Sequence, residues 1–158
     1  MSPRLSICIP TYNGLLHIRQ LLDSLMRSSC TDFEIVVSDD CSGDGTWDFL
    51  QDICWRDNRV RVFRNNINLG MDRNFARSVD LATGEFVWLC GQDDVISPDG
   101  IAAVIDLIAG DAILDFIHMP YVMLSEAQHK QDNGVTQEFS NNLHGTGLLD
   151  FLAANEQK

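Results

Sequence analysis

Short apolar segments alternate with segments of helical periodicity along most of this chain. Residues 5–9 form an apolar run that ends in the turn Pro-Thr-Tyr-Asn-Gly, and residues 15–28 then carry apolar side chains at helical spacing. The order recurs at residues 34–38, where a β-branched run leads into an Asp-rich loop and another helix. This alternation predicts an α/β domain whose mainly parallel sheet is covered by helices on both faces, with right-handed crossovers.

The rest of the chain continues the pattern as far as residue 124. Polar residues without clear periodicity follow, which is typical of a long loop. We therefore expect a core domain over residues 1–124 and a polar region over residues 125–158. The further elements expected are strands at 59–64, 86–90 and 112–124, and helices at 71–83, 98–108 and 147–154.

Composition excludes several classes of protein. The 158 residues are 45% hydrophobic and 22% charged, which is typical of one globular domain. The net charge of −12 disfavours binding to nucleic acid or to an anionic membrane surface. No apolar run is long enough to span a bilayer and no signal peptide is recognised, so we expect a cytoplasmic protein without a transmembrane segment. The five cysteines lack metal-binding spacing and are expected to be free thiols.

Three of the expected strands end in polar loops, at residues 10–14, 39–45 and 91–94. In an open α/β sheet, ligands bind beyond the carboxyl ends of the strands. Two of these loops contain adjacent aspartates, Asp39-Asp40 and Asp93-Asp94, which would repel one another at one sheet edge without a cation or hydrogen-bond donors. Carboxylate oxygens suit Mg²⁺ or Mn²⁺ bridging a diphosphate. Since no phosphate-binding glycine motif is present, we expect the metal to hold the diphosphate.

Four segments share their order and spacing with a known family. They read SICIPTYN at residues 6–13, FEIVVSDDCSGDGT at 33–46, NLGMDRNF at 68–75 and GEFVWLCGQDD at 84–94. Together they resemble the family-2 glycosyltransferases of the GT-A fold, over about residues 4–120. The last two segments look most like the abequosyltransferase-like and rhamnosyltransferase-like branch, which builds bacterial surface polysaccharide. The resemblance implies inverting transfer of a sugar from a nucleotide-diphosphate sugar to an acceptor hydroxyl.

The resemblance also implies roles for the first two loops. Pro10 and Thr11 would line the base pocket, and Tyr12 would stack on the base, because an aromatic face accepts any base. Asp40 would accept the N3–H of uracil or thymine in a charge-assisted hydrogen bond. Its neighbour Asp39 is open to a simpler interpretation, as the cap of the turn.

The third loop and one arginine complete the implied site. Asp93 would hold the ribose hydroxyls and Asp94 the divalent cation, Mg²⁺ or Mn²⁺, although the family often has a further aspartate at the position of Gly91. Arg73 would lie near the base and phosphates, and a surface salt bridge is the alternative for it. The remaining arginines near the loops are expected to be mostly solvated: Arg56, Arg59, Arg61, Arg64 and Arg77.

Substrate and mechanism are less defined. Asp40 favours a UDP- or dTDP-sugar, whereas the branch includes users of CDP-sugars. The implied acceptor is a saccharide or lipid-linked saccharide, which would place the protein peripherally at the inner membrane face. The general base is expected beyond residue 158, so no catalytic residue is assigned. The alternatives are a donor-binding fragment without transferase activity, a nucleotidyltransferase, which would need a basic glycine-rich phosphate loop, and a purely structural role.

Overall fold

The computed structural model describes residues 2–110. The chain divides into two compact units, Met1–Asp111 and Ala112–Lys158, and the described residues belong to the first. The strand expected at 112–124, the domain boundary at 124, the polar region at 125–158 and the helix at 147–154 lie outside the described residues.

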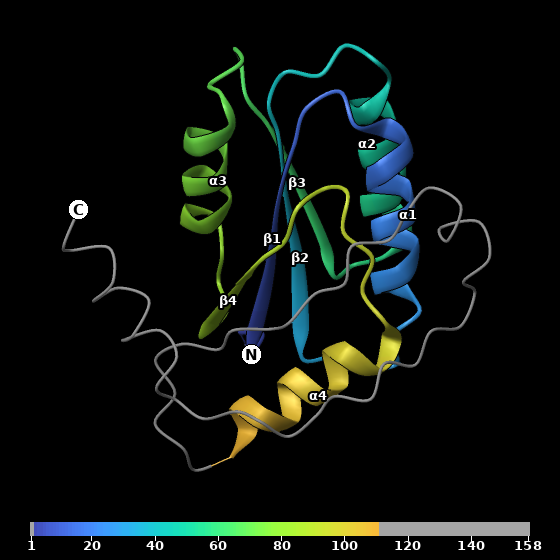
Figure 1. Cartoon of the computed structure of the whole chain (residues 1–158), viewed down its shortest axis with the longest axis vertical. Coiled ribbons are helices and arrows are strands. Elements are labelled where there is room, and N and C mark those ends of the chain that lie inside the picture. Colours follow the sequence, from blue (N-terminus) through green and yellow to red (C-terminus); the bar gives the residue numbers. More distant parts are fainter. Residues whose placement is uncertain (1, 111–158) are drawn as a thin grey trace, which may run out of the picture. The chain divides into compact units, whose positions relative to one another are not determined.

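Within residues 2–110, four strands alternate with four helices, as the sequence predicted (Figure 1). The chain order is β1 (Leu5–Thr11), α1 (Leu15–Met26), β2 (Phe33–Asp39), α2 (Thr46–Arg56), β3 (Val60–Arg64), α3 (Met71–Asp80), β4 (Phe86–Leu89) and α4 (Pro98–Ala109). The strands form a fully parallel sheet in the order β3-β2-β1-β4. β1 extends past the predicted Ile9, because Pro10 and Thr11 still pair with Ser38 and Asp39 of β2.

Helices lie on both sides of this sheet. α1 and α2 lie together on one side, and α3 packs on β1 and β2 from the opposite side (Figure 1). The chain moves from β1 through β2 to β3 in one direction and then returns to place β4 on the other side of β1. The strand order therefore reverses between β1 and β4, and such a switch point is where α/β sheets bind ligands.

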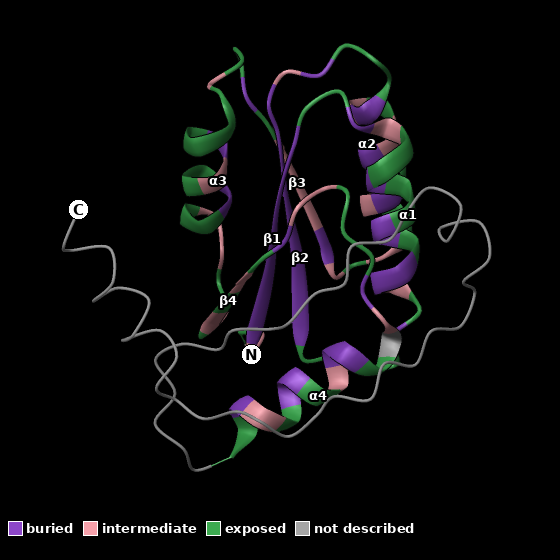
Figure 2. Cartoon of the chain, in the orientation of Figure 1, coloured by how far each residue is buried: buried purple, intermediate pink, exposed green. Residues whose placement is uncertain are grey.

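The core forms around the two central strands. β1 and β2 are buried along their whole length (Figure 2), which explains why both read as nearly continuous apolar runs. From α1, four apolar side chains at helical spacing complete this core: Ile18, Leu21, Leu22 and Leu25. The five cysteines, all among the described residues, are free as expected, and burial raises the pKa of the Cys8 thiol to about 12.

β4 differs from the central strands. Its residues alternate between partly buried and exposed, and Val87 and Leu89 are 42% and 54% exposed. Within residues 2–110 this strand pairs with β1 alone. Its apolar composition did not predict the alternation, because a continuous apolar run is typical of a strand covered on both faces.

A buried carboxylate on β2 ties three strands together. Glu34 is 6% exposed, accepts a hydrogen bond from the Ser6 hydroxyl at 2.7 Å and from the Thr83 backbone N–H at 2.7 Å, and forms an ion pair with Arg61 at 2.7 Å. Burial alone would raise the pKa of Glu34, but the bonds from Arg61, Ser6 and Thr83 outweigh it and lower the pKa. This carboxylate links β1, β3 and the turn before β4.

Of the five arginines expected to be mostly solvated, three are exposed and two, Arg59 and Arg61, are partly buried. Three of the five donate hydrogen bonds to the protein: Arg59, Arg61 and Arg64. Nη1 of Arg59 donates to the carbonyls of Ser28 and Cys30, each at 3.0 Å, and Nη2 donates to the carbonyl of Met26 at 3.2 Å. A guanidinium has five donors in a fixed plane, so one side chain satisfies three carbonyls at and just beyond the end of α1. Local sequence does not reveal such a role, because the acceptors lie about 30 residues earlier.

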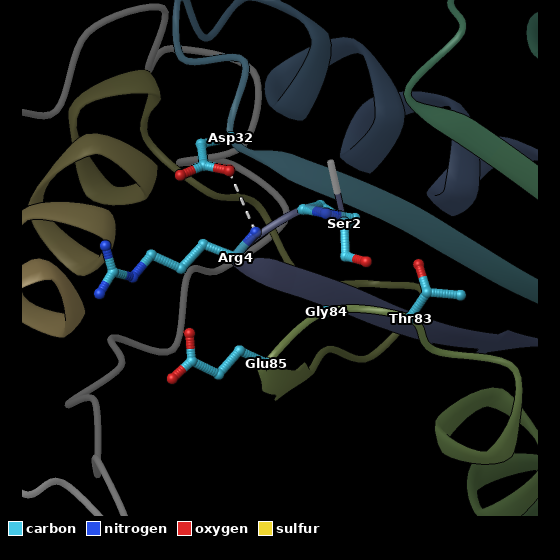
Figure 3. A pocket seen from close by; sticks show the side chains of 7 residues that line it. Ser2, Arg4, Asp32, Thr83, Gly84 and Glu85 are labelled. Carbon is cyan, nitrogen blue, oxygen red and sulfur yellow. Dashed lines mark hydrogen bonds between the residues drawn. The ribbon is translucent and has the colours of Figure 1, made fainter.

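A pocket of about 520 Å³ lies at the amino-terminal ends of β1, β2 and β4 (Figure 3). Arg4, Asp32 and Glu85 contribute charged groups of both signs, and the Arg4 backbone N–H donates to Asp32 Oδ1 at 3.1 Å. This is the edge of the sheet opposite to the one where parallel α/β sheets bind ligands, so we assign it no function. None of the helices described up to residue 110 is long and apolar enough to cross a membrane.

Candidate functional site at the carboxyl ends of the strands

The loops that follow β1 and β2 are tied together. The Asn13 backbone N–H donates to the Ser42 hydroxyl at 2.9 Å, and the Gly43 backbone N–H donates to Asn13 Oδ1 at 2.8 Å. Asn13 adopts a positive φ of 46°, a conformation that asparagine tolerates better than most residues. The two loops therefore hold each other in place through one asparagine.

The first loop offers an open aromatic face. Tyr12 is 48% exposed, whereas Pro10 and Thr11, the last residues of β1, are buried. The Thr11 hydroxyl donates to Gln92 Oε1 at 2.6 Å, so its side chain is already engaged. Of the three predicted pocket residues, Tyr12 thus offers an exposed ring, whereas the side chains of Pro10 and Thr11 are buried.

Asp40 is buried and already holds three donors. It is 2% exposed, and its carboxylate accepts from Asn65 Nδ2 at 2.7 Å, from the Leu69 backbone N–H at 2.8 Å and from the Gly70 backbone N–H at 2.9 Å. A carboxylate has about four acceptor sites, so about one remains for a ligand. Asp40 therefore shapes the loop of residues 65–70 in addition to any contact with a ligand.

A second buried amide joins the strands to α3. Asn74 of α3 is 2% exposed; its Nδ2 donates to the Ser38 carbonyl at 2.8 Å and the Thr11 carbonyl at 3.5 Å, and its Oδ1 accepts from Asn65 Nδ2 at 3.0 Å. It bridges the carboxyl ends of β1 and β2. Asn65 and Asn74 were not among the predicted site residues, although Asn74 lies in the 68–75 segment that carries the family resemblance.

Asp39 caps its turn, which was the simpler of its two interpretations. It is fully buried, and its Oδ2 accepts from the Ser42 backbone N–H at 3.2 Å and lies 3.4 Å from Nε of Arg64. The adjacent aspartates of this loop are thus both turned into the protein. Their repulsion is relieved by hydrogen-bond donors and by Arg64.

The aspartates of the third loop are exposed instead. Asp94 Oδ2 accepts from the Gly91 backbone N–H at 2.7 Å and lies 3.5 Å from the Cys90 thiol, whose pKa is raised by burial and by the charge of Asp94. A Cβ atom on Gly91 would lie 2.9 Å from Asp93 Oδ1 and 3.3 Å from Asp94 Oδ2. The two carboxylates therefore converge over Gly91, where a side chain would crowd them.

Two exposed carboxylates make an incomplete shell for a divalent cation. Within the described part of the chain, no group of three or more His, Cys, Asp or Glu side chains gathers as metal ligands do. Mg²⁺ characteristically binds through one or two carboxylates and takes its remaining ligands from water and substrate phosphates. The exposed carboxylate of Asp94, with that of Asp93 beside it, has the chemistry to hold a cation that takes its other ligands from water and a diphosphate. Arg73 is exposed in the first turn of α3 and makes no ion pair within residues 2–110.

The fold places the chain in the class of GT-A glycosyltransferases, because its parallel sheet with helices on both sides is shared with solved glycosyltransferase structures. The chain belongs to glycosyl transferase family 2, whose sequence model matches residues 6–153. The abequosyltransferase RfbV of Salmonella typhimurium is 41% identical over 103 residues, which are 62% of this chain and 30% of the relative. A Campylobacter jejuni GalNAc(5)-diNAcBac-PP-undecaprenol beta-1,3-glucosyltransferase is 36% identical over 93 residues, 58% of this chain and 30% of the relative.

Solved structures agree with this assignment. Residues 1–349 of S. aureus TarS in complex with UDP share 31% identity at a TM-score of 0.61, and the match covers 67% of this chain and 32% of that 1–349 chain. A mannosyltransferase of Pyrobaculum calidifontis, in complex with GDP-Man and Mn²⁺, matches at 23% identity and a TM-score of 0.61, which supports the fold alone. The chain spans about a third of the length of these relatives.

Proposed function

We propose that this chain is the donor-binding part of a glycosyltransferase that takes its sugar from a nucleotide-diphosphate sugar. One observation carries the proposal: the exposed ring of Tyr12 and the exposed carboxylates of Asp93 and Asp94 follow adjacent strands at the switch point. A nucleotide needs a stacking face at one end and charge neutralisation at the other. The UDP-GlcNAc complex of TarS, 30% identical to this chain, supports a nucleotide-sugar ligand.

We assign the base to the first two loops. Tyr12 stacks on it, and the backbone at Pro10 and Thr11 lines its pocket. Asp40 accepts the N3–H of uracil or thymine through the acceptor site that its three protein donors leave unused. UDP- and dTDP-sugars are therefore the favoured donors, with a CDP-sugar as the competing choice.

We assign the rest of the nucleotide to the third loop and α3. Asp93 holds the ribose hydroxyls, Asp94 holds Mg²⁺ or Mn²⁺, and Arg73 faces the phosphates from the first turn of α3. A bound cation neutralises the charge that develops on the leaving diphosphate. Gly91 assists by leaving room for both carboxylates.

The reaction we propose is inverting transfer. The acceptor oxygen bonds to the anomeric carbon while the bond from that carbon to the diphosphate breaks. The hydroxyl proton passes to a general base, for which we assign no residue. The acceptor would be a saccharide or lipid-linked saccharide of a bacterial surface polysaccharide, as the names of the relatives suggest. We also propose that the protein is cytoplasmic and lies peripherally at the inner membrane face.

Binding of donor without transfer is the second candidate. It is favoured by the position of the assigned residues, since all of them serve the donor and none the acceptor. The two candidates share the site and differ in turnover. Release of UDP from UDP-GlcNAc by this chain, with or without added saccharide, would favour the transferase, and binding without release would favour the second candidate.

The decisive experiment is calorimetric titration of the 158-residue chain with UDP in Mn²⁺ and again in EDTA. We expect saturable binding that weakens when the metal is removed. The same titrations with dTDP and CDP test the base preference, and the expected order places CDP last. If none of the three nucleotides binds in Mn²⁺, the proposed donor site is wrong.

A further inference from the structure

The hydrogen-bond ladder between β1 and β4 ends before the site. Cys8 pairs with Leu89 as the last registered pair, and the Cys90 backbone N–H donates to the Cys8 carbonyl at 3.0 Å. In a parallel ladder of this register, the next bond would run from the N–H of residue 10 to the Cys90 carbonyl. Pro10 has no N–H, so the ladder cannot continue. The loops that carry Tyr12 and the two aspartates must be joined in another way.

The side chain of Gln92 supplies that connection. Its Oε1 accepts from the Thr11 hydroxyl at 2.6 Å and from the Tyr12 backbone N–H at 3.1 Å. In the described part of the chain, these are the only hydrogen bonds between residues 10–14 and residues 91–94. One amide oxygen therefore replaces the missing strand pairing beyond Pro10.

The neighbourhood of Gln92 is shaped around this side chain. A Cβ atom on Gly14 would overlap the Gln92 amide, with Cδ at 2.5 Å and Nε2 at 2.8 Å. The backbone of Gly14 has φ −118° and ψ 29°, which is not the left-handed region that needs glycine. A larger residue at position 14 would therefore require the Gln92 amide to move, although it would not strain the backbone.

We propose that Gln92 is a positioning residue of the donor site, which holds the ring of Tyr12 at a fixed place relative to Asp93 and Asp94. This inference rests on the proposed function, because it treats Tyr12 as the face for the base and the aspartates as the groups for ribose and cation. Gln92 touches neither end of the ligand. It sets the separation between them, and one nucleoside diphosphate can use both ends at full strength only if they are held at a separation that it can span.

The test compares Gln92→Leu, which removes the acceptor at similar size, with Gln92→Glu, which keeps an oxygen in its place. Calorimetric titration with UDP in Mn²⁺ should show Kd raised about tenfold in Gln92→Leu, as expected for a lost pair of hydrogen bonds, and largely restored in Gln92→Glu. The matched control is Gln51→Leu on the exposed side of α2, which should leave Kd unchanged.

A double-mutant cycle separates positioning from general support of the fold. In a Tyr12→Ala background, Gln92→Leu should cause little further loss of UDP affinity, because the ring that it positions is gone. Without nucleotide, hydrogen exchange of the Tyr12 amide should accelerate in Gln92→Leu. Gly14→Ala forces the Gln92 amide to move. It should likewise weaken UDP binding and accelerate exchange of the Tyr12 amide, and it replaces Gln92→Leu in the test if that variant does not fold.

The possible failures are distinct. Unchanged UDP affinity in Gln92→Leu, or an equal loss with and without the Tyr12 ring, would overturn the positioning role and leave the proposed function standing. Failure of the parent chain to bind UDP, dTDP or CDP would overturn the proposed function and this inference together.

Discussion

The Nδ2 atom of Asn65 donates to Oδ1 of Asp40 across 2.7 Å, and both residues are buried. The same nitrogen donates to Oδ1 of Asn74 at 3.0 Å, and Nδ2 of Asn74 donates to the carbonyl of Ser38, two residues before Asp40. The acid that we assign to the base is thus fixed by residues from the loop after β3 and from α3. Its orientation is preorganised before any nucleotide arrives.

Replacing Asn65 should therefore destabilise the fold. Asn65→Leu removes a donor from a buried carboxylate, and we expect a loss of about 1–3 kcal/mol in the free energy of unfolding. Urea unfolding followed by circular dichroism measures it. The neighbouring Asn66→Ala changes an exposed side chain and should stay within about 0.5 kcal/mol of the parent chain. Equal stabilities for the two variants would contradict the buried role of Asn65.

Asp94→Asn tests the assigned metal ligand. The amide oxygen can still accept from the Gly91 N–H, so the loop should persist, but the charge that attracts the cation is lost. We expect UDP affinity in Mn²⁺ to fall by more than about tenfold, since even outer-shell partners of a metal change affinity by that much. Affinity in EDTA should not change. The control is Asp106→Asn, an exposed acid on α4, and a Mn²⁺ response retained in Asp94→Asn would remove the assignment.

Tyr12 should contribute to nucleotide affinity through its ring alone. Tyr12→Ala is expected to weaken UDP binding by about 1–3 kcal/mol, the usual value of one base–aromatic stack. Tyr12→Phe keeps the ring and should bind UDP nearly as the parent chain does, because the hydroxyl is not required for stacking. Titration calorimetry of both variants measures the difference. A loss of similar size in Tyr12→Phe would show that the hydroxyl, and not the face of the ring, makes the contact.

Glu34 should make the free energy of unfolding depend on pH in the acidic range. Its folded-state pKa is lowered below the unfolded value of about 4.3, so its contribution is complete above that pH and is lost as the pH falls through the folded pKa. Glu34→Gln should therefore be less stable than the parent chain at pH 7, and the difference should shrink below about pH 4.3. Urea unfolding between pH 7 and pH 3 checks this.

The matched control for Glu34 is Glu85→Gln, because Glu85 is exposed and should leave the pH profile as it is. A constant difference between the parent chain and Glu34→Gln over the whole pH range would show that the contribution of Glu34 does not depend on its ionisation.

Even the conservative replacement of Arg59 by lysine should destabilise the fold. Arg59→Lys keeps the charge, but one ammonium group cannot reproduce the planar fork that reaches the carbonyls of Met26, Ser28 and Cys30. We expect a loss of about 1–3 kcal/mol in the free energy of unfolding. Arg56→Lys is the control, since the Arg56 side chain is 72% exposed and its pair with Asp52 should contribute little. Equal tolerance of lysine at both positions would contradict this view of Arg59.

The sequence by itself determined the order of strands and helices and the edge of the sheet at which we propose the site. Both follow from local patterns: periodic apolar residues form each element, and parallel strands bring the loops after them to one edge. Local chemistry also predicted binding roles for Tyr12, Asp93 and Asp94, and the structure leaves these side chains exposed. Composition could not separate the buried strands β1 and β2 from the half-exposed β4.

Only the tertiary structure decided which polar residues support the site. Gln92 meets Thr11 across 81 positions of the chain, and Asn65 meets Asp40 across 25. In the sequence each reads as a polar residue of a loop, because a hydrogen bond depends on the position of its partner and not on the residues beside it. The two aspartate pairs look alike in sequence for the same reason. Folding buries Asp39 and Asp40 among donors and leaves Asp93 and Asp94 open to a ligand.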